Sequence, residues 1–321
     1  HVLNPKQVNK FKLSYNDLPK NDYVDSFVIA DCLRFGRINK EVYLGDYRYA
    51  ALKNLTRARF FAVQNLTREK QRFMNHLFKK YSTMAQEKVF SDTFSTTALA
   101  VYESFESAEA LANMDLHQLT EFIIEKGKKR FPDPDSVAKA IQKAARSSYR
   151  LPKTVNDSVN QVLSISISSM RAMESQIKAF DKAIAEQMAL IPNTLTSVKG
   201  IGPVYSAGII AEIGDINRFP TQASLAKYAG LVWSQHQSGD FEAQNTRMIH
   251  SGNRYLKYYL CEAALSLVRC DAEYRSFYHR KYKEVNKYQH KRALALTARK
   301  LVRLVFRLLK DNCLYRAPES K

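Results

Sequence analysis

The sequence predicts a mainly α-helical protein, and the placement of glycine and proline is the first reason. The 321 residues include only ten Gly and nine Pro, and neither type occurs between positions 46 and 126. Stretches without these helix breakers favour long helices. Seven of the ten Gly fall between Gly200 and Gly252. We therefore expect a compact, Gly-rich helical domain in the last third of the chain.

Hydrophobic periodicity is the second reason. Apolar residues recur at helical spacing from Tyr47 to about Tyr81, which predicts one long amphipathic helix. The apolar positions are Leu52, Leu55, Val63, Leu66, Phe73 and Leu77. Nine Lys and Arg share this stretch with one acid, Glu69. Charge pairing along the helix cannot neutralise that excess, so we expect a polyanion to bind this face; a solvated helix face is the alternative.

A heptad pattern lies between Pro152 and Pro192 and predicts a coiled-coil helix. The apolar seam consists of Leu163, Met170, Ile177, Ile184 and Ile191, with Met173 and Phe180 at intervening positions. Ser166 and Gln187 interrupt the second register. The pattern therefore suits an antiparallel intramolecular hairpin with residues 47–81 as well as a dimer contact. Between the two long helices, residues 87–150 predict a small helical insert.

Charge and composition restrict the function. The formal net charge is +19, and 45% of the residues are hydrophobic, enough for real cores. No apolar run of about 18 residues predicts a membrane span, and no signal peptide is evident. The four Cys form no CxxC pair, which argues against a zinc site or a disulfide framework. We expect a soluble, cytoplasmic, nucleoid-associated protein that binds nucleic acid rather than membrane.

A second basic helix is expected near the end of the chain. Residues 278–310 contain eleven Lys and Arg against a single acid, Glu284. An apolar stripe that includes Leu294, Leu301 and Leu308 predicts that one side of the helix packs and the other presents cations. This cationic side is a candidate nucleic-acid surface.

A Gly-rich turn after Leu195 has the form of a helix-hairpin-helix. Lys199, Gly200 and Gly202 precede Pro203, which suits a first helical turn. Free backbone N–H groups at such a helix start bind phosphate, and Lys199 adds positive charge. These three residues are therefore candidate DNA-backbone contacts; a purely structural turn is the alternative.

Two carboxylates near the beginning are candidate metal ligands. Asp22 and Asp25 stand three residues apart in the first turn of a predicted helix, so both lie on one face. Mg²⁺ accepts one or two carboxylates together with water and substrate phosphates. Acids in a first helical turn also cap the helix and favour its dipole, and spacing alone favours that structural role.

Serine residues in the Gly-containing segment 228–257 are candidate nucleophiles for a phosphodiester. Ser234, Ser238 and Ser251 precede or accompany three cations suited to binding DNA phosphates, Arg247, Arg254 and Lys257. His236 and Asp240 would complete a Ser–His–Asp set, but closeness in sequence is weak evidence for a triad. The sequence contains no P-loop and no HExxH motif.

Taken together, the motifs closely resemble the bridge-RNA-guided insertion-sequence recombinases, DEDD-type transposases related to the Piv-like DNA invertases. The resemblance rests on short motifs that occur in order, and residues 195–260 are its most specific part. The motifs are Lys20-Asn-Asp-Tyr-Val-Asp25, Val198-Lys-Gly-Ile-Gly-Pro203, Ala211-Glu-Ile-Gly-Asp215, Leu225-Ala-Lys-Tyr-Ala-Gly-Leu231, Ser238-Gly239 and Gly252-Asn-Arg-Tyr-Leu256.

The resemblance implies three domains. Residues 1–46 would be the C-terminal part of a RuvC-like domain of RNase H fold, residues 47–192 a coiled-coil and helical insert region, and residues 193–321 a helical transposase domain with a catalytic serine. Asp22 and Asp25 match the last two of four metal-binding acids, and Ser238 matches the nucleophile. The first Asp and the Glu would precede Asp22 by many tens of residues. We expect a preceding part of the protein to supply them; a separate chain, or loss of catalysis, is the alternative.

The predicted function is an RNA-guided transposase that cuts and rejoins DNA through a 5′-phosphoserine intermediate with Mg²⁺. The expected partners are donor and target DNA, a structured guide RNA and further copies of the chain in a homodimer or tetramer. A RuvC-like structure-selective nuclease and a non-catalytic DNA- or RNA-binding protein are the alternatives.

Overall fold

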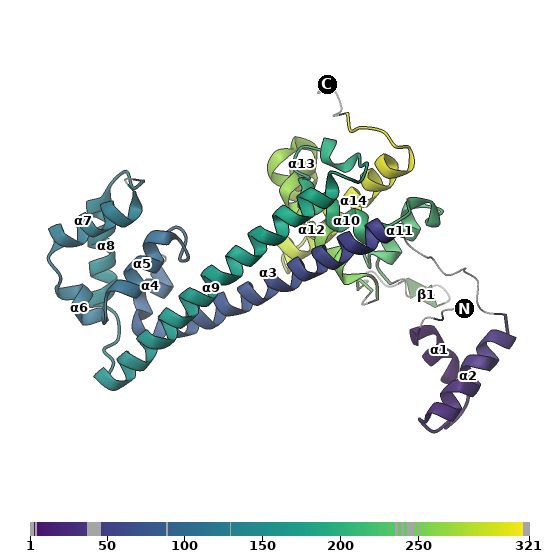
Figure 1. Cartoon of the computed structure of the whole chain (residues 1–321), viewed down its shortest axis with the longest axis horizontal. Helices are drawn as coiled ribbons and strands as arrows, with labels where there is room; N and C mark the ends of the chain where they lie inside the picture. Colours follow the sequence, from purple (N-terminus) through teal and green to yellow (C-terminus); the bar gives the residue numbers. More distant parts are fainter. Residues whose placement is uncertain are drawn as a thin grey trace. The chain divides into compact units, whose positions relative to one another are not determined.

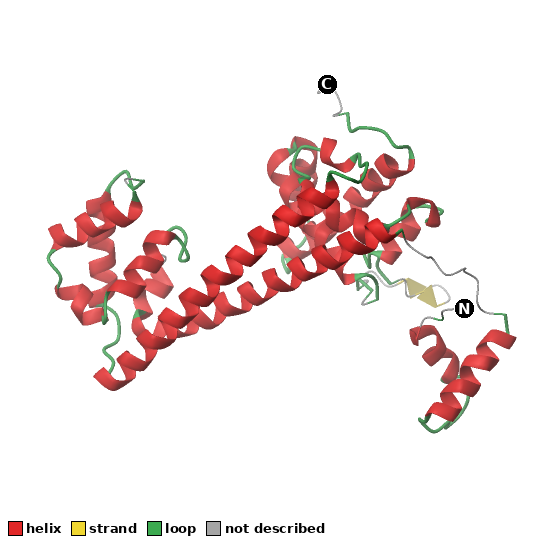
Figure 2. Ribbon diagram, viewed as in Figure 1, coloured by secondary structure: helices red, strands yellow, loops and turns green. Residues whose placement is uncertain are grey.

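The computed structural model confirms a mainly helical chain (Figure 2). It describes residues 3, 5–36, 46–87, 89–128, 130–234, 237–238, 241–242, 247–249 and 251–316. These residues divide into two compact units, His1–Tyr47 and Arg48–Lys321. Each unit is considered by itself below.

The first unit is a pair of helices, α1 (Pro5–Lys12) and α2 (Asp22–Arg34). Helix α2 begins where Asn21 accepts a hydrogen bond from the backbone N–H of Val24 at 2.8 Å, as an N-cap residue does. The Tyr15 hydroxyl donates to the buried carboxylate of Asp31, which ties the segment after α1 to α2. The described residues of this unit contain no strand, so its RuvC-like origin stays a prediction.

The second unit contains two long antiparallel helices, α3 (Tyr47–Lys80) and α9 (Lys153–Met188), which lie side by side in Figure 1. Residue pairs that join them run in opposite directions along the chain: Arg59 with Asp181, Lys70 with Glu174, and Glu69 with Ser166. Ser166, which interrupts the predicted seam, is buried, and its hydroxyl donates a hydrogen bond to Glu69. Of the two arrangements expected, the chain adopts the intramolecular hairpin.

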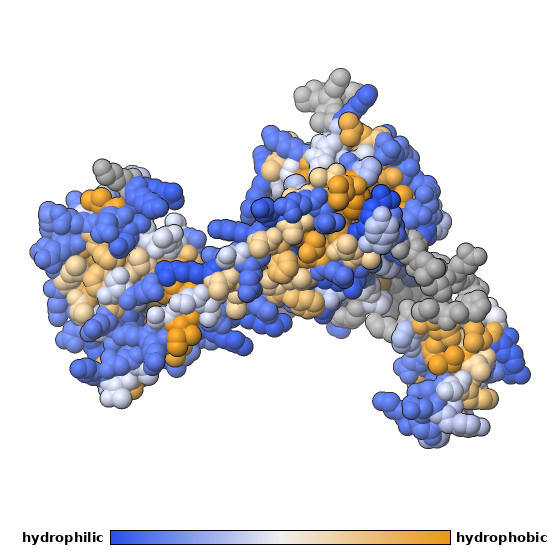
Figure 3. Space-filling view, in the orientation of Figure 1, coloured by the Kyte–Doolittle hydropathy of each residue, from blue (hydrophilic) through white to orange (hydrophobic). Residues whose placement is uncertain are grey.

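The hairpin is anchored at both ends and is less covered in the middle. Leu52 and Ile184 belong to the core of the C-terminal domain, whereas Leu77 and Leu163 belong to the core of the insert. Between these cores, apolar residues such as Ile177 are only half-buried. Figure 3 shows pale and orange residues along the helical pair between the two cores. Burial of the predicted heptad positions is therefore complete only where a domain packs over them.

The expectation that a polyanion neutralises the basic face of residues 47–81 is wrong for several of its cations. Arg57 forms an ion pair with Glu212 at 2.6 Å, and Arg59 and Lys70 pair with acids of α9. These acids are more than 100 residues away along the sequence, so charge counting within one helix could not reveal them. Tertiary packing thus pairs three of the nine cations in residues 47–81 with acids of α9 and α10.

The insert is a small helical domain with its own core, as the sequence predicts. Its helices are α4 (Ser82–Glu87), α5 (Thr96–Ser104), α6 (Ala108–Asn113), α7 (Leu116–Gly127) and α8 (Pro134–Arg146). Asp133 caps α8 by accepting from Ser136 N at 3.0 Å, and Pro134 occupies the first turn. The insert thus begins and ends at the far end of the helical pair (Figure 1).

The C-terminal domain packs short helices around α12. Its elements are η1 (Leu195–Ser197), α10 (Pro203–Ile213), η2 (Ile216–Arg218), α11 (Gln222–Tyr228), β1 (Gln237–Ser238), β2 (Phe241–Glu242), α12 (Arg254–Cys270), α13 (Ala272–Lys283) and α14 (Gln289–Lys310). The basic stretch 278–310 is two helices rather than one. The chain turns at Tyr288, whose φ of 52° is left-handed, and α13 and α14 pack together. None of the helices described combines the length and apolar character that crossing a membrane requires.

A buried lysine lies at the junction of α3 with the insert. Lys80 is only 3% exposed, and its Nζ donates to the carbonyl oxygens of Tyr102, at 2.9 Å, and Phe105. Burial disfavours the ammonium form and lowers the pKa of Lys80 to about 8. Because the unfolded chain has the higher lysine pKa, it binds more protons than the folded chain above pH 8.

We therefore expect the free energy of unfolding to rise by about 2 kcal/mol between pH 8 and pH 10 through Lys80. From about pH 9 the Cys261 thiol, and above about pH 10 the buried hydroxyls of Tyr81 and Tyr102, act in the opposite direction, because burial raises their pKa. Urea unfolding at several pH values measures the slope. Lys80→Met should abolish it, and Lys79→Met, at an exposed position, should retain it. An equal slope in the Lys80→Met variant would contradict the assignment.

Candidate functional site

A hollow of about 510 Å³ lies at the N-terminal end of α12 and brings together three predicted DNA contacts. Arg247 comes from the segment before α12, while Arg254 and Lys257 lie three residues apart on one face of the helix. Ser251 and Gly252 complete the rim. Ser251, Arg247 and Arg254 are exposed. Three cations around an open hollow at a helix N-terminus form a site suited to a phosphate group.

Two glycines allow the backbone to form this hollow. Gly230 and Gly252 have φ values of +71° and +135°, which side chains other than hydrogen rarely permit. A Cβ atom on Gly252 would lie 2.6 Å from the Cα and N of Gly230, so the two loops touch through their backbones. The Asn253 N–H donates to the carbonyl of Tyr228 at 2.7 Å and fastens the same contact. The close contact between the two backbones therefore requires glycine at both positions.

Two antiparallel backbone pairings lie between the hollow and the predicted nucleophile, Ser238. Trp233 pairs with Met248, and Ser234 N donates to the Arg247 carbonyl at 2.8 Å. Farther along, β1 pairs with β2, so that Ser238 stands opposite Phe241. The structure describes the backbone of Ser238 within β1. Gly239, His236 and Asp240 lie outside the described residues, so the Ser–His–Asp alternative stays a prediction.

The three candidate serines differ in what the structure describes. The Ser234 hydroxyl donates to the Arg247 carbonyl at 3.0 Å and so has a structural partner. Ser251 is exposed and lines the hollow directly. Ser238 therefore keeps its assignment from the resemblance, and Ser251 becomes its strongest competitor.

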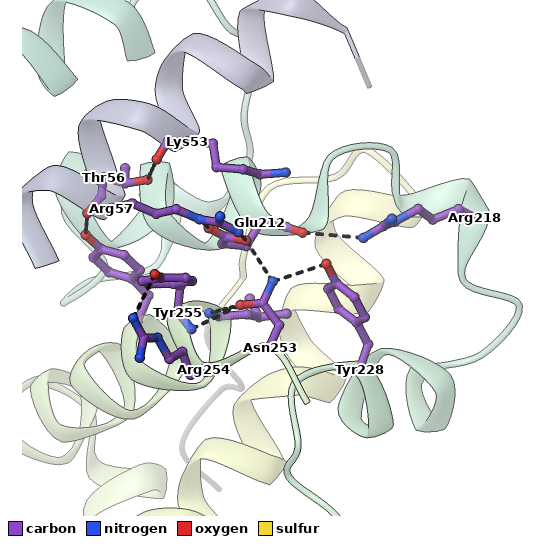
Figure 4. A network of polar contacts seen from close by, with 11 residues as sticks. Lys53, Thr56, Arg57, Glu212, Arg218, Tyr228, Asn253, Arg254 and Tyr255 are labelled. Atoms are coloured by element: carbon purple, nitrogen blue, oxygen red, sulfur yellow. Dashed lines mark hydrogen bonds and ion pairs between the residues drawn. The ribbon is translucent and has the colours of Figure 1, made fainter. Parts of the chain in front are cut away.

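A buried carboxylate orients the N-terminus of α12 (Figure 4). The side chain of Glu212 is fully buried and accepts from Arg57 Nε at 2.6 Å, Arg57 Nη2 at 2.9 Å and Asn253 Nδ2 at 2.7 Å. The opposite atom of the Asn253 amide, Oδ1, accepts from the N–H groups of Tyr255 and Leu256 and caps α12. Glu212 thus determines which way Asn253 faces and connects α3 and α10 to the hollow.

Glu212 is absent from the site residues that the sequence predicts, although the sequence contains one signal for it. It is the single charged residue in the otherwise apolar run Ser206–Ile213, and a buried acid requires a partner. The identity of the partner, Arg57, was not accessible from the sequence because 155 positions separate the two.

Aromatic rings hold Arg254 at the edge of the hollow. Its guanidinium lies 5.4 Å from the ring centre of Phe61 and 4.8 Å from that of Tyr255. Arg254 Nη2 also donates to the Tyr255 hydroxyl at 2.9 Å. A cation restrained in this way loses less side-chain entropy when it binds a phosphate than a free one does.

The other predicted DNA contacts lie at the opposite end of α12. A Cβ atom on Gly200 would lie 3.3 Å from Cys270, the last residue of α12. Since α12 has 17 residues, the turn containing Lys199, Gly200 and Gly202 is about 24 Å from the hollow along the helix axis. The predicted contacts therefore form two groups rather than one site.

The turn at Gly200 has half of the expected hairpin motif. Gly202 precedes α10 without a side-chain cap, and Pro203 occupies the first turn, as predicted. The element before the turn, η1, is a three-residue 3-10 helix, so only the second of the two expected helices is a full α-helix. The exposed Lys199 and the uncapped start of α10 still suit an anion.

Asp22 and Asp25 both lie in the first turn of α2, as predicted. Asp22 is exposed, whereas Asp25 pairs with Lys12 at 2.6 Å. Two carboxylates one turn apart fit part of a Mg²⁺ site, which needs further ligands. Among the described residues, no three His, Cys, Asp or Glu side chains gather closely enough to hold a metal ion. These residues fit a partial metal site, and Lys12 is a competitor for one carboxylate.

Comparison with protein-family models gives two matches. Residues 193–279 match the model described as the transposase IS116/IS110/IS902 family, and residues 1–81 match a DEDD transposase model of the IS110 type. Two separate segments of the chain are therefore similar to transposases of the IS110/IS116 family. The first match contains the hollow, the glycine pair and β1. Residues 82–192, which form the insert and α9, lie outside both matches.

Three relatives agree with this similarity. The chain is 26% identical to an uncharacterized 44.8 kDa protein of insertion element IS116 from Streptomyces clavuligerus, over 97% of this chain and 76% of that protein. It is 33% identical to an uncharacterized 43.6 kDa protein of insertion element IS110 from Streptomyces coelicolor, over 45% of this chain and 34% of that protein. A probable family 20 transposase of Pseudomonas aeruginosa is 32% identical, over 31% of this chain and 28% of that protein.

Removal of the buried carboxylate tests the network in Figure 4. Glu212→Ala leaves the Arg57 guanidinium and the Asn253 amide without their partner, so we expect the free energy of unfolding to fall by about 3 kcal/mol. Urea denaturation measures the change. Glu125→Ala is the matched control, because it removes an exposed ion pair with Lys126 worth less than about 1 kcal/mol. Equal losses of unfolding free energy in the two variants would show that the Glu212 network stabilises the fold no more than an exposed ion pair does.

The glycine contact gives a second prediction. Gly252→Ala places a methyl group against the Gly230 backbone at a left-handed φ, so we expect a loss of about 2 kcal/mol in unfolding free energy. Gly202→Ala is the control, because its φ is −76° and no atom lies within 4 Å of the added Cβ. It should cost less than about 1 kcal/mol. Thermal denaturation compares them, and an unchanged Gly252→Ala variant would refute the contact.

Proposed function

We propose that this chain belongs to a transposase that cuts and rejoins DNA strands at sites selected by a structured guide RNA. The observation that carries the DNA part is the cationic hollow at the N-terminus of α12, within the segment that matches the transposase family. Arg247, Arg254 and Lys257 surround a space that suits a phosphodiester and its developing charge. The RNA part rests on the resemblance of the sequence motifs.

The proposed chemistry is transesterification at a serine. The Ser238 hydroxyl attacks the scissile phosphorus, a bond forms between Oγ and phosphorus, and the bond to the 3′ oxygen breaks. The serine proton leaves with a base, and the departing 3′ oxygen takes up a proton. Rejoining reverses these steps, when a 3′ hydroxyl attacks the phosphoserine and releases the serine. No external energy source is required, because the covalent link conserves the phosphodiester.

We assign Asp22 and Asp25 to a Mg²⁺ site together with two further acids that the resemblance implies. Bound Mg²⁺ would lower the pKa of an attacking hydroxyl and stabilise charge on the phosphoryl oxygens. The part played by the described residues is to supply two carboxylates from one turn of α2. Lys12 must release Asp25 for both carboxylates to take part fully.

The division of labour between protein and RNA follows from the charge of the chain. Base pairing with a guide RNA would select the sequence, while cations hold phosphate backbones without reading bases. Recombination brings two duplexes together, so we propose a homodimer or tetramer as the active assembly. The half-buried apolar residues midway along α3 and α9 are available for such a contact.

Two other functions compete with this proposal. A RuvC-like nuclease would use the Asp22 and Asp25 site with metal-bound water and would need no serine. A non-catalytic protein would use the same cations to bind DNA or RNA without cleavage. The three functions differ in one product, a covalent bond between protein and DNA.

The decisive experiment incubates full-length protein, guide RNA, Mg²⁺ and end-labelled DNA, and then separates the products under denaturing conditions. We expect labelled DNA that migrates with the protein. Ser238→Ala should abolish this adduct, whereas Ser251→Ala and Ser234→Ala, the matched serine controls, should retain it. Arg254→Ala should slow adduct formation about 100-fold, as loss of a cation beside a reacting phosphate does.

Other outcomes separate the alternatives. Loss of the adduct in Ser251→Ala but not in Ser238→Ala would transfer the nucleophile to the rim of the hollow. Cleavage that survives all serine substitutions but not Asp22→Ala would indicate the nuclease. Binding without cleavage would indicate the non-catalytic protein.

A further inference from the structure

A second hollow, of about 690 Å³, lies between α13, α14 and the C-terminal segment. Three arginines from two parts of the chain line it: Arg303 and Arg307 on α14, and Arg316 beyond the helix. All three are exposed. A smaller hollow of about 480 Å³ adjoins it, since Glu273 and Lys300 line both, and it adds Arg280 and Phe277. We call the two hollows together the C-terminal groove.

Acids neutralise only part of the positive charge in the C-terminal groove. Lys300 pairs with Glu273 at 2.6 Å, whereas Arg307 meets Asp311 only at 3.9 Å, with both side chains more than half exposed. Within the described part of the chain, Arg303 forms no ion pair. Its neighbour Arg299 is another cation, and burial together with Arg303 lowers the pKa of Arg299. Cations that outnumber the carboxylates around them favour an anionic ligand.

The groove also offers apolar and aromatic surface. Tyr315 is half-buried and Leu314 is 67% exposed, and both line the larger hollow. Phe277 lies in the smaller hollow, with Lys300 and Arg280 over its ring at 5.0 and 5.4 Å. Cations interleaved with aromatic rings bind single-stranded nucleic acid, because unpaired bases stack on the rings while phosphates meet the cations. A duplex keeps its bases stacked inside and cannot use those rings.

The C-terminal groove is separate from the proposed catalytic hollow. Tyr315 N–H donates to Ser197 Oγ at 2.9 Å, and the Tyr315 hydroxyl donates to Asp271 at 3.4 Å. These contacts place the C-terminal segment beside the Gly200 turn and the end of α12. The groove therefore lies about 24 Å, the length of α12, from the hollow at its N-terminus.

We propose that the C-terminal groove binds the phosphodiester backbone of a single nucleic-acid strand while the hollow at the other end of α12 holds the reacting DNA. The ligand is a segment of unpaired RNA or DNA, which share this chemistry. The inference goes beyond the proposed function, because it requires neither Ser238 nor a metal ion.

The test measures binding of fluorescent oligonucleotides of about 12 residues by anisotropy, with oligo(rU), oligo(dT) and a duplex of equal length as probes. Arg303→Glu combined with Arg307→Glu should weaken single-strand binding at least tenfold and reduce the salt slope by about 1 to 2. The charge-matched control is Lys139→Glu with Lys143→Glu, two exposed positions on α8 of the insert. It should weaken binding less than about twofold. Circular dichroism checks that both variants are folded.

A second pair of variants tests stacking. Tyr315→Ala should weaken binding about tenfold, whereas Tyr315→Phe, which keeps the ring, should bind as the parent does. Stronger binding of oligo(rU) than of oligo(dT) would identify RNA as the source, and the reverse would identify DNA. Equal weakening by the groove and control substitutions, or groove substitutions that weaken duplex binding as much as single-strand binding, would overturn the proposal. Ser238→Ala should bind the probes normally, so failure of the serine chemistry and failure of the groove are distinguishable.

Discussion

The fully buried carboxylate of Glu212 is the interaction on which the proposed site depends. An ionised acid without water needs several hydrogen bonds, and Glu212 receives them from Arg57 and Asn253. Asn253 in turn caps α12 and donates to the Tyr228 hydroxyl at 3.1 Å. One carboxylate therefore connects the long helix α3, the start of α12 and the end of α11. The orientation of the cationic hollow follows from this connection, because Arg254 and Lys257 project from the helix that Asn253 starts.

The same arrangement explains how the net charge of +19 is distributed. On α3, Arg57, Arg59 and Lys70 face acids supplied by α9 and α10. Positive charge also gathers around the hollow before α12 and in the C-terminal groove. Helix α12 separates them by about 24 Å along its axis. A polynucleotide partner thus has two separate places at which to release counterions.

Much of the helical architecture could be predicted from local sequence. The lack of Gly and Pro between positions 46 and 126 anticipates α3, and Asn21 anticipates the start of α2. Prediction failed where the structure depends on contacts between residues that are remote in sequence. The cations of α3 looked unpaired because Glu212 and Asp181 are remote in sequence. The basic stretch 278–310 looked like one helix, but the packing of α13 on α14 requires a reversal at Tyr288.

The candidate site divides in the same way. Local sequence identified Arg254 and Lys257 as candidate DNA contacts and determined that Asp22 and Asp25 share a turn. Only the tertiary structure decided that Arg247 joins the first two, that the Gly200 turn lies at the other end of α12, and that Glu212 orients Asn253. The physical reason is the distance along the sequence over which each interaction acts. Helix propensity, capping and side-chain periodicity act over a few residues, whereas a buried charge takes its partner from whichever segment packing brings near.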